Sequence, residues 1–86
     1  MTYAIVTPKV VQKQLDALPD EIYQRIFKKL EKLTEDPRPD GVTKLKGLED
    51  EYRIRIGDYR VRYKINDSEL LILLVQCKHR KDSYRK

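Results

Sequence analysis

The side chains best suited to chemistry are five basic residues that alternate with apolar ones over residues 52–65. Four of the five are arginines, whose planar guanidinium groups suit bidentate contacts with phosphate. Read with the two-residue period of a strand, the segment predicts two strands joined at Gly57–Asp58, with the apolar side chains on one face. The other face then carries cations with no acidic residue among them: Arg53, Arg55, Arg60, Arg62 and Lys64.

Like charges placed directly across a strand pair repel each other, at a cost from a few tenths to about 1 kcal/mol per pair. Five cations on one hairpin face therefore indicate a polyanionic partner, and nucleic acid is the natural one. The alternative is a solvated basic face that only keeps the protein soluble. The excess of arginine over lysine favours binding of phosphate.

The net charge of +5 arises entirely in the second half of the chain, which holds twelve basic and seven acidic residues against seven of each in the first half. Lys44 and Lys46 precede the hairpin, and a basic segment runs from Lys78 to the end of the chain. Within that segment Tyr84 stands among basic residues, a pattern that suits stacking on a nucleobase beside bound phosphates. A disordered basic tail is the alternative.

A small sheet with one covered face is needed to position these strands. Residues 3–6 predict a first strand that ends before Pro8. Apolar spacing predicts a short amphipathic helix over residues 8–18 and a second helix from Asp20 to the break at residues 36–41. The apolar stripe of the second helix consists of Ile22, Ile26, Phe27, Leu30 and Leu33.

After the hairpin, a turn at residues 66–68 leads into an unbroken apolar run, residues 70–75. The chain thus predicts an α+β fold: an N-terminal strand, a helical hairpin, then a three-strand antiparallel meander, forming one small sheet with helices on one face. A strand that is apolar on both sides must be covered on both sides. Since the helices cover one side, we expect a separate partner to cover apolar surface beside the basic face.

The length and the cysteine content set further limits. Eighty-six residues correspond to one domain, residues 1–86. The single cysteine, Cys77, excludes an internal disulfide, fits a reducing compartment, and is expected to be a small buried hydrophobe rather than a nucleophile. No segment has the pattern of a signal peptide or a membrane span, so we expect a cytoplasmic protein with no membrane partner.

Three stretches together carry a family resemblance: Lys44-Leu45-Lys46-Gly47-Leu48, the Tyr-Arg-x-Arg-x-Gly-Asp-Tyr-Arg-x-x-Tyr run from Tyr52 to Tyr63, and a later His-Arg-x-x-x-Tyr over residues 79–84. With them, the chain resembles the RelE side of the RelE/ParE superfamily of type II toxins. The order of the predicted elements agrees with that superfamily over essentially the whole chain.

The resemblance implies a single RelE-like toxin domain that cleaves mRNA in the decoding site of the ribosome and is neutralised by a cognate RelB-like antitoxin. By matching position, Arg53 and Arg55 stand where such toxins carry basic residues facing RNA, and Arg60 matches a phosphate-binding arginine. Arg80 matches the arginine that assists the leaving group. Tyr84 matches the tyrosine that stacks on or orients the substrate. Besides Arg53, the basic residues expected to bind RNA are Arg62, Lys64, Lys44, Lys46 and Lys78.

RNA cleavage by the neighbouring 2′-OH builds charge on the phosphoryl oxygens and delivers a proton to the leaving 5′-oxygen. Arg55, Arg60 and Arg80 are suited to hold the scissile phosphate. No cluster of side chains has metal-ligand spacing, so no metal or other cofactor is expected. Because arginine stays protonated, the candidates for proton transfer are Tyr84 and His79, although strand alternation aims His79 away from Arg80. The third alternative is that positioning by the ribosome replaces a protein base.

Two rival functions share these features. A ParE-like toxin on the same scaffold would inhibit DNA gyrase, and a non-catalytic module would only bind RNA or DNA. Retention of Arg60, Arg80 and Tyr84 together favours the nuclease.

Overall fold

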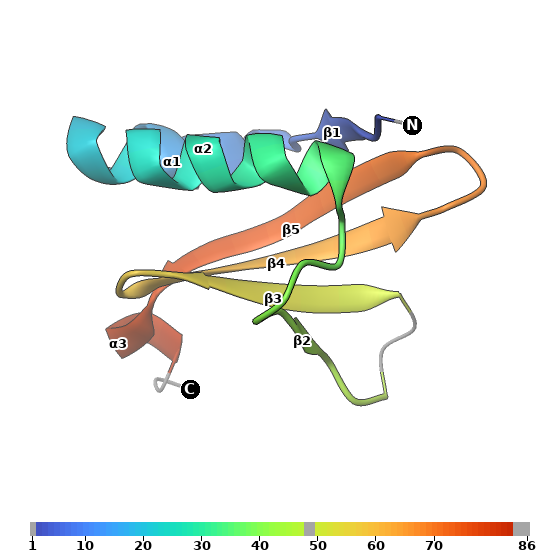
Figure 1. Ribbon diagram of the computed structural model, residues 1–86. Coiled ribbons are helices and arrows are strands. Elements are labelled where there is room, and N and C mark those ends of the chain that lie inside the picture. The colour runs from blue at the N-terminus through green and yellow to red at the C-terminus, as the bar shows by residue number, and fades with distance from the viewer. Residues whose placement is uncertain (1, 48–49, 84–86) are drawn as a thin grey trace.

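The computed structural model describes residues 2–47 and 50–83, with the side chains of Asp82 and Ser83 left out of the description. Its elements follow in the order β1 (Ala4–Val6), α1 (Lys9–Asp16), α2 (Asp20–Glu35), β2 (Thr43–Lys44), β3 (Glu51–Ile56), β4 (Tyr59–Asn66), β5 (Leu71–His79) and α3 (Arg80–Ser83). Figure 1 shows α1 and α2 stacked on one face of a twisted sheet, with α3 on the other side.

The five strands form one sheet in the order β1-β5-β4-β3-β2. β3, β4 and β5 are the predicted antiparallel meander, and β1 pairs with β5 in the parallel direction. The α+β prediction, with the two predicted helices on one face of the sheet, is therefore confirmed. Two short elements, β2 and α3, were not predicted, because two and four residues are too few to show a periodic pattern.

The hairpin between β3 and β4 has the predicted two-residue turn. Gly57 has a φ of 59°, in the left-handed region that residues with a side chain disfavour. Two-residue hairpin turns require such a positive φ at their first residue. A turn of two residues fixes the register, so Ile56 pairs with Tyr59 and every earlier residue of β3 has a defined partner on β4. The turn therefore decides which basic side chains are neighbours.

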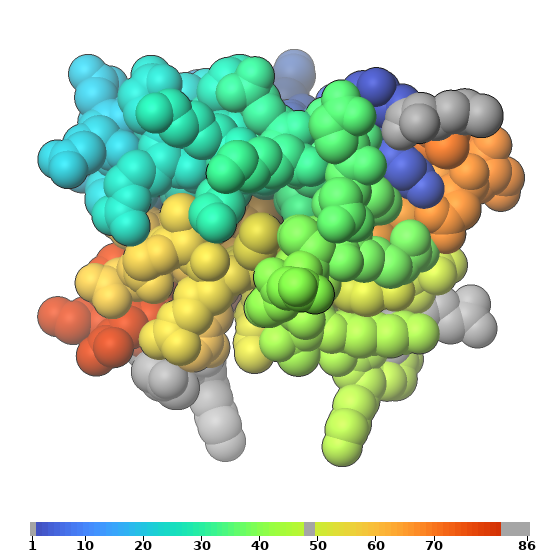
Figure 2. All heavy atoms as spheres, in the orientation of Figure 1, coloured from blue at the N-terminus to red at the C-terminus, as the bar shows by residue number. Residues whose placement is uncertain are grey.

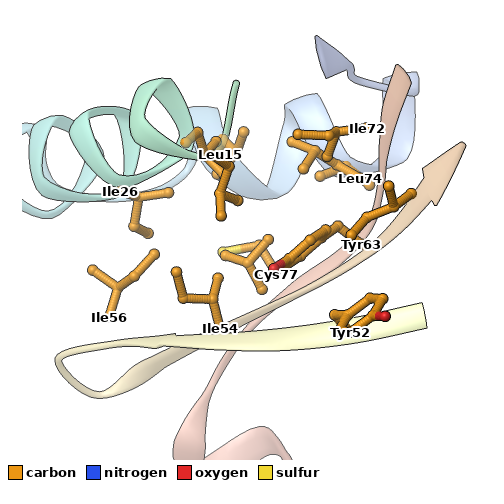
Figure 3. Packing of buried hydrophobic residues seen from close by; sticks show 14 residues of the cluster. Leu15, Ile26, Tyr52, Ile54, Ile56, Tyr63, Ile72, Leu74 and Cys77 are labelled. Carbon is orange, nitrogen blue, oxygen red and sulfur yellow. The ribbon is translucent and has the colours of Figure 1, made fainter. Parts of the chain in front are cut away.

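The core lies between the helices and the sheet (Figure 3). Val11 and Leu15 of α1 and Leu33 of α2 are buried against the apolar face of the strands. That face presents Tyr52, Ile54, Ile56, Val61, Tyr63, Ile65, Ile72, Leu74 and Cys77. Figure 2 shows α2 (cyan to green) and the connection after it (green) packed over the β3–β4 hairpin (yellow).

Phe27 departs from the predicted apolar stripe of α2. Phe27 is 47% exposed, whereas Ile26, Leu30 and Leu33 are buried. The reason is helical geometry: position 27 lies about 100° around the helix from position 26, beyond the stripe that faces the sheet. Phe27 instead stacks on Tyr23 one turn earlier, with ring centroids 6.3 Å apart.

A candidate phosphate-binding face

The basic side chains of the hairpin share the sheet face opposite α1 and α2. Arg53 pairs with Arg62, and Arg55 pairs with Arg60, directly across the β3–β4 ladder. Their apolar neighbours along each strand are buried on the other face. The predicted separation of a core face from a cationic face is therefore confirmed. We call the outer surface formed by Arg53, Arg55, Arg60, Arg62, Lys64 and Lys78 the cationic face.

β5 contributes Lys78 to the cationic face, directly opposite Arg60, and Gln76 opposite Arg62. A shallow hollow of about 260 Å³ is lined by side chains from all three strands. These side chains are Arg53, Arg60, Arg62, Gln76 and Lys78. A concave surface of this size with four cations is suited to hold a phosphate group and its neighbours.

The expectation that no acidic residue lies on this face is wrong. Glu51 begins β3, two residues before Arg53, so alternation turns its side chain to the same face. Its carboxylate is buried, and its Oε1 accepts hydrogen bonds from Nε of Arg62 at 3.1 Å and from Nη2 at 2.5 Å. The alternation that predicted the cationic face would have revealed Glu51 if it had been extended one residue before Tyr52.

The other predicted RNA-binding lysines are dispersed. Lys44 pairs with Tyr52 on the edge strand β2, which turns its side chain to the face opposite the cationic one. Lys46 is exposed in the connection that follows β2. Lys64 is exposed on the cationic face, at the end away from the hairpin turn, with Glu51 as its cross-strand partner.

Arg80 lies where β5 ends and α3 begins. Its backbone N–H donates to the carbonyl oxygen of Asp58 at 2.6 Å, which anchors α3 at the β3–β4 turn. The residue is exposed and stands next to the turn end of the cationic face, since Tyr59 pairs with His79. Tyr84 lies outside the described residues.

The side chain of His79, the candidate acid or base, points away from the sheet face that carries Arg60 and Lys78. Its ring meets the Tyr59 ring edge-on, with centroids 5.0 Å apart. The backbone N–H of Lys81 donates to Nδ1 of His79 at 3.1 Å. Because Nδ1 accepts this bond, Nε2 carries the hydrogen in the neutral imidazole.

A second, larger hollow of about 900 Å³ adjoins the cationic face. Its apolar lining includes Val6 of β1 with Leu71 and Leu73 of β5, and its polar lining includes Glu51 and Lys64. Val6 and Leu73 remain 41% and 37% exposed. The expected uncovered apolar surface beside the basic face is therefore present.

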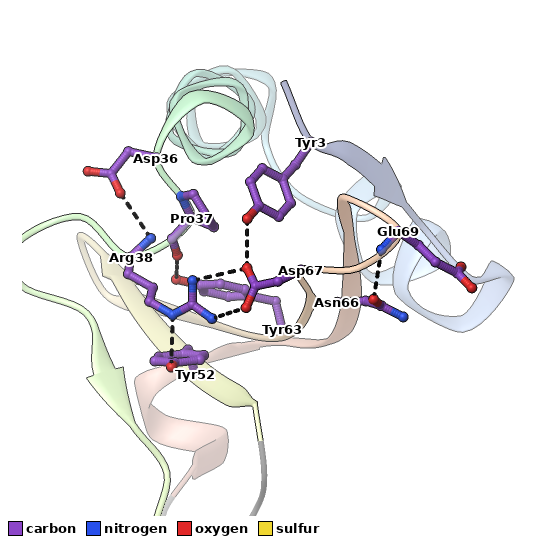
Figure 4. Close-up of polar contacts among 9 residues, drawn as sticks. All are labelled: Tyr3, Asp36, Pro37, Arg38, Tyr52, Tyr63, Asn66, Asp67 and Glu69. Atoms are coloured by element: carbon purple, nitrogen blue, oxygen red, sulfur yellow. Dashed lines mark hydrogen bonds and ion pairs between the residues drawn. The ribbon is translucent and has the colours of Figure 1, made fainter. Parts of the chain in front are cut away.

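A polar cluster that sequence reasoning missed holds the connection after α2 against the sheet (Figure 4). Asp67 accepts from the Tyr3 hydroxyl at 2.6 Å and from Nη2 of Arg38 at 2.8 Å, and Nε of Arg38 donates to the Tyr52 hydroxyl at 3.0 Å. The hydrogen bonds that Asp67 accepts from Arg38, the larger cause, and from Tyr3 lower the pKa of Asp67. Partners so distant in sequence give no local signal.

Two buried groups in the core are chemically quiet. The Tyr63 hydroxyl donates to the carbonyl oxygen of Pro37 at 2.8 Å, and burial raises the pKa of Tyr63 to about 12. Burial also raises the pKa of the Cys77 thiol to about 11, which keeps it protonated and unreactive as a nucleophile. The expectation that Cys77 is a buried hydrophobe is confirmed.

Within residues 2–47 and 50–83, no three His, Cys, Asp or Glu side chains gather closely enough to form a metal site. No helix in that same part of the chain is long and apolar enough to cross a membrane.

Comparison with known proteins gives concordant matches. The family model described as ParE toxin of type II toxin–antitoxin system, parDE, matches residues 5–84. The chain is 28% identical to the putative toxin RelE1 of Methanocaldococcus jannaschii, over 99% of this chain and 98% of the relative. A chain of the archaeal RelE–RelB complex from Pyrococcus horikoshii is 38% identical, with a TM-score of 0.83 over 93% of this chain and 97% of that one. A mutant of the E. coli toxin RelE in the free state is 25% identical, with a TM-score of 0.82 over 96% of this chain and 88% of that one.

Proposed function

This chain is a RelE-like toxin and belongs to the ParE toxin family of type II toxin–antitoxin systems, and on that premise we propose that it is a ribosome-dependent mRNA endoribonuclease. The observation that carries the proposal is the cationic face, on which Arg53, Arg55, Arg60 and Lys78 leave adjacent strands side by side. Such a face supports binding of an RNA backbone. The toxin then acts in the cytoplasm, and the ribosome and mRNA are its partners.

The proposed reaction is a metal-independent transesterification. The 2′-OH attacks the adjacent phosphorus and loses its proton to water, the bond from phosphorus to the 5′-oxygen breaks, and that oxygen takes up a proton from water. A 2′,3′-cyclic phosphate and a 5′-hydroxyl form. Arg55, Arg60 and Arg80 stabilise the charge that builds on the phosphoryl oxygens. One well-placed donor of this kind contributes roughly 3 to 4 kcal/mol, or about 10²- to 10³-fold in rate.

Proton transfer falls to groups other than the arginines, which stay protonated. His79 is poorly placed for this step, because its side chain lies on the other face of the sheet from Arg60 and Lys78 and its Nδ1 already accepts a hydrogen bond from Lys81. Tyr84 is proposed to orient the substrate. Positioning of the 2′-OH by the ribosome, in line with the leaving oxygen, then supplies a large share of the acceleration.

The test is a cleavage map in a translation extract. Purified wild type should produce new mRNA 5′ ends only on ribosome-bound message. Arg80→Ala should reduce the cleavage rate about 100-fold or more, by loss of a charged donor, and Tyr84→Phe should reduce it through the lost hydroxyl. Lys44→Ala, a change on the opposite face, is the control and should cleave as wild type does. The proposal would be contradicted if mRNA stayed intact with wild type and with every variant, at toxin concentrations as high as those that arrest growth in cells.

One alternative draws on the matching family model, which is named for ParE: inhibition of DNA gyrase on the same scaffold. A supercoiling assay run beside the cleavage map separates the two, because a gyrase inhibitor leaves message intact and poisons supercoiling. A non-catalytic binding module predicts a third result. Arg80→Ala would then lower RNA affinity and its salt dependence modestly, with no cleavage in any sample.

We also propose that a RelB-like antitoxin neutralises this toxin by binding over the larger hollow, as the P. horikoshii relative is a RelE–RelB complex. Val6 and Leu73 offer exposed apolar surface there. Removing such surface from water contributes about 25 cal/mol per Å², against which the entropy lost on association must be set. An antitoxin segment with apolar and acidic residues would cover this hollow and extend over the cationic face, where it would displace RNA.

Growth assays test the antitoxin proposal. Expression of the toxin alone should arrest growth, and co-expression of the antitoxin should restore it. Leu73→Asp should leave toxicity intact and abolish the rescue, because a carboxylate replaces apolar surface in the hollow. Val10→Asp alters an exposed apolar residue on α1, away from the hollow, and should still be rescued. Equal rescue of both variants would place the antitoxin elsewhere.

A further inference from the structure

Glu51 is the one charged residue that is buried among those that the structure describes, with 3% of its surface exposed. A buried carboxylate is unfavourable unless it is paired and hydrogen-bonded. The direct cross-strand partner of Glu51 is Lys64, yet its carboxylate reaches diagonally to Arg62, which donates from both Nε and Nη2 to Oε1. The pair therefore fixes one edge of the Arg62 guanidinium.

Arg62 would not hold this place by itself. It lies directly across from Arg53, and Arg60 and Lys78 line the same hollow. Repulsion from these cations would drive an unpaired, flexible arginine side chain out into solvent. The buried carboxylate offsets that repulsion and keeps the Arg62 side chain, which is 36% exposed, at the hollow.

We propose that Glu51 is a positioning residue for RNA cleavage: its carboxylate holds Arg62 in the smaller hollow, so that Arg62 is ready to contact the RNA backbone. The inference rests on the proposed nuclease function and deepens it. Pre-organisation of a contact lowers the entropy that substrate binding must remove and keeps the phosphate aligned. The hydrogen bonds to Glu51 use Nε and Nη2 of Arg62, so Nη1 is the group proposed to contact the substrate.

A role as a simple counter-ion makes the opposite prediction. If Glu51 only lowered the positive charge of the face, its removal would strengthen binding of RNA and leave cleavage at least as fast. Glu51→Asp, which keeps the charge but shortens the side chain by one methylene, would then behave as wild type. A positioning role requires both the charge and the reach of Glu51.

The experiment compares Glu51→Ala, Glu51→Gln and Glu51→Asp with wild type, well below their melting temperatures. Single-turnover cleavage of ribosome-bound mRNA is measured beside binding of a 2′-O-methyl RNA oligonucleotide, which lacks the attacking hydroxyl. We expect Glu51→Ala to cleave about tenfold more slowly and to gain no RNA affinity. Glu51→Asp should also be slow, and Glu51→Gln intermediate because an amide oxygen accepts more weakly than a carboxylate.

Two further variants complete the design. Glu69→Gln removes one exposed negative charge away from Arg62 and should match wild type. Glu51→Ala/Arg62→Ala, which leaves no unpaired buried charge, should cleave within about threefold of Glu51→Ala if Glu51 acts through Arg62. Tighter RNA binding with unimpaired cleavage in Glu51→Ala, or wild-type behaviour of Glu51→Asp, would overturn the inference. If wild type cleaves no message, the nuclease proposal fails, and the binding data alone decide whether Glu51 organises Arg62.

Discussion

Arg55 on β3 and Arg60 on β4 are direct partners in the antiparallel ladder, so two guanidinium groups leave the same face of the sheet side by side. Like charges placed directly across a strand pair repel each other. A phosphate between them would turn this repulsion into attraction, because each guanidinium can donate two hydrogen bonds to phosphate oxygens. The pair therefore links the stability of the fold to the RNA binding that we propose.

Replacing Arg55 with glutamine should stabilise the protein while weakening its activity. The variant loses one like-charge contact across the strand pair, which is worth a few tenths to about 1 kcal/mol in the free energy of unfolding. Chemical denaturation with urea at low salt measures this gain. At 1 M NaCl the gain should shrink, because the Debye length falls to about 3 Å. A loss of stability at low salt would show that repulsion between Arg55 and Arg60 is not a significant cost.

Arg60→Ala should weaken RNA binding by removal of a phosphate contact. For single-stranded RNA, log affinity falls with log salt concentration, and loss of one phosphate contact makes this slope less steep by about 0.7. Titration of a 2′-O-methyl RNA oligonucleotide at several salt concentrations measures the slope. Lys44→Ala removes the same unit of charge from the opposite face and should change the slope far less. Equal effects of both variants would mean that net charge, rather than the cationic face, determines affinity.

Asp67→Asn should remove part of the acid sensitivity of the fold. Hydrogen bonds from Arg38 and Tyr3 hold the pKa of Asp67 below its ordinary value. The stability from this group is therefore present above the unfolded-state pKa, near 3.9, and is lost as pH falls through the folded-state pKa. Urea midpoints measured from pH 5 to pH 2 should decline less in Asp67→Asn than in wild type. Asp40→Asn, an exposed control, should keep the wild-type decline.

Tyr63→Phe should weaken the fold at neutral pH and remove part of its alkaline sensitivity. The lost hydroxyl leaves the Pro37 carbonyl without its hydrogen bond in the core, at a cost of about 1 to 3 kcal/mol. Because burial raises the pKa of Tyr63 to about 12, its contribution is present below pH 10 and is lost as pH rises through 12. Unfolding curves at pH 7, 10 and 12 test both statements. An alkaline decline as steep in Tyr63→Phe as in wild type would assign that sensitivity to other groups.

The sequence by itself determined the features that depend on local periodicity. Alternation along residues 52–65 separated the buried face of Tyr63 from the basic face of Arg60, because successive side chains of a strand point to opposite sides. The two-residue turn at Gly57 fixed the hairpin register. Helical spacing gave α1 and α2, although the stripe of α2 was drawn one residue too wide at Phe27.

Only the tertiary structure decided which distant groups meet. Strict alternation from Leu74 would turn Lys78 toward the core, but the β4–β5 ladder pairs Arg62 with Gln76 and Tyr63 with Leu74, which leaves one extra residue on β5. This β-bulge reverses the phase of the strand, so that Cys77 enters the core and Lys78 joins the cationic face opposite Arg60. The pairing of two strands fixes a bulge. It also determines that Glu51 bonds to Arg62 rather than to Lys64. Neither the bulge nor the ion pair produces a periodic pattern in the sequence, because both depend on packing between strands rather than within one strand.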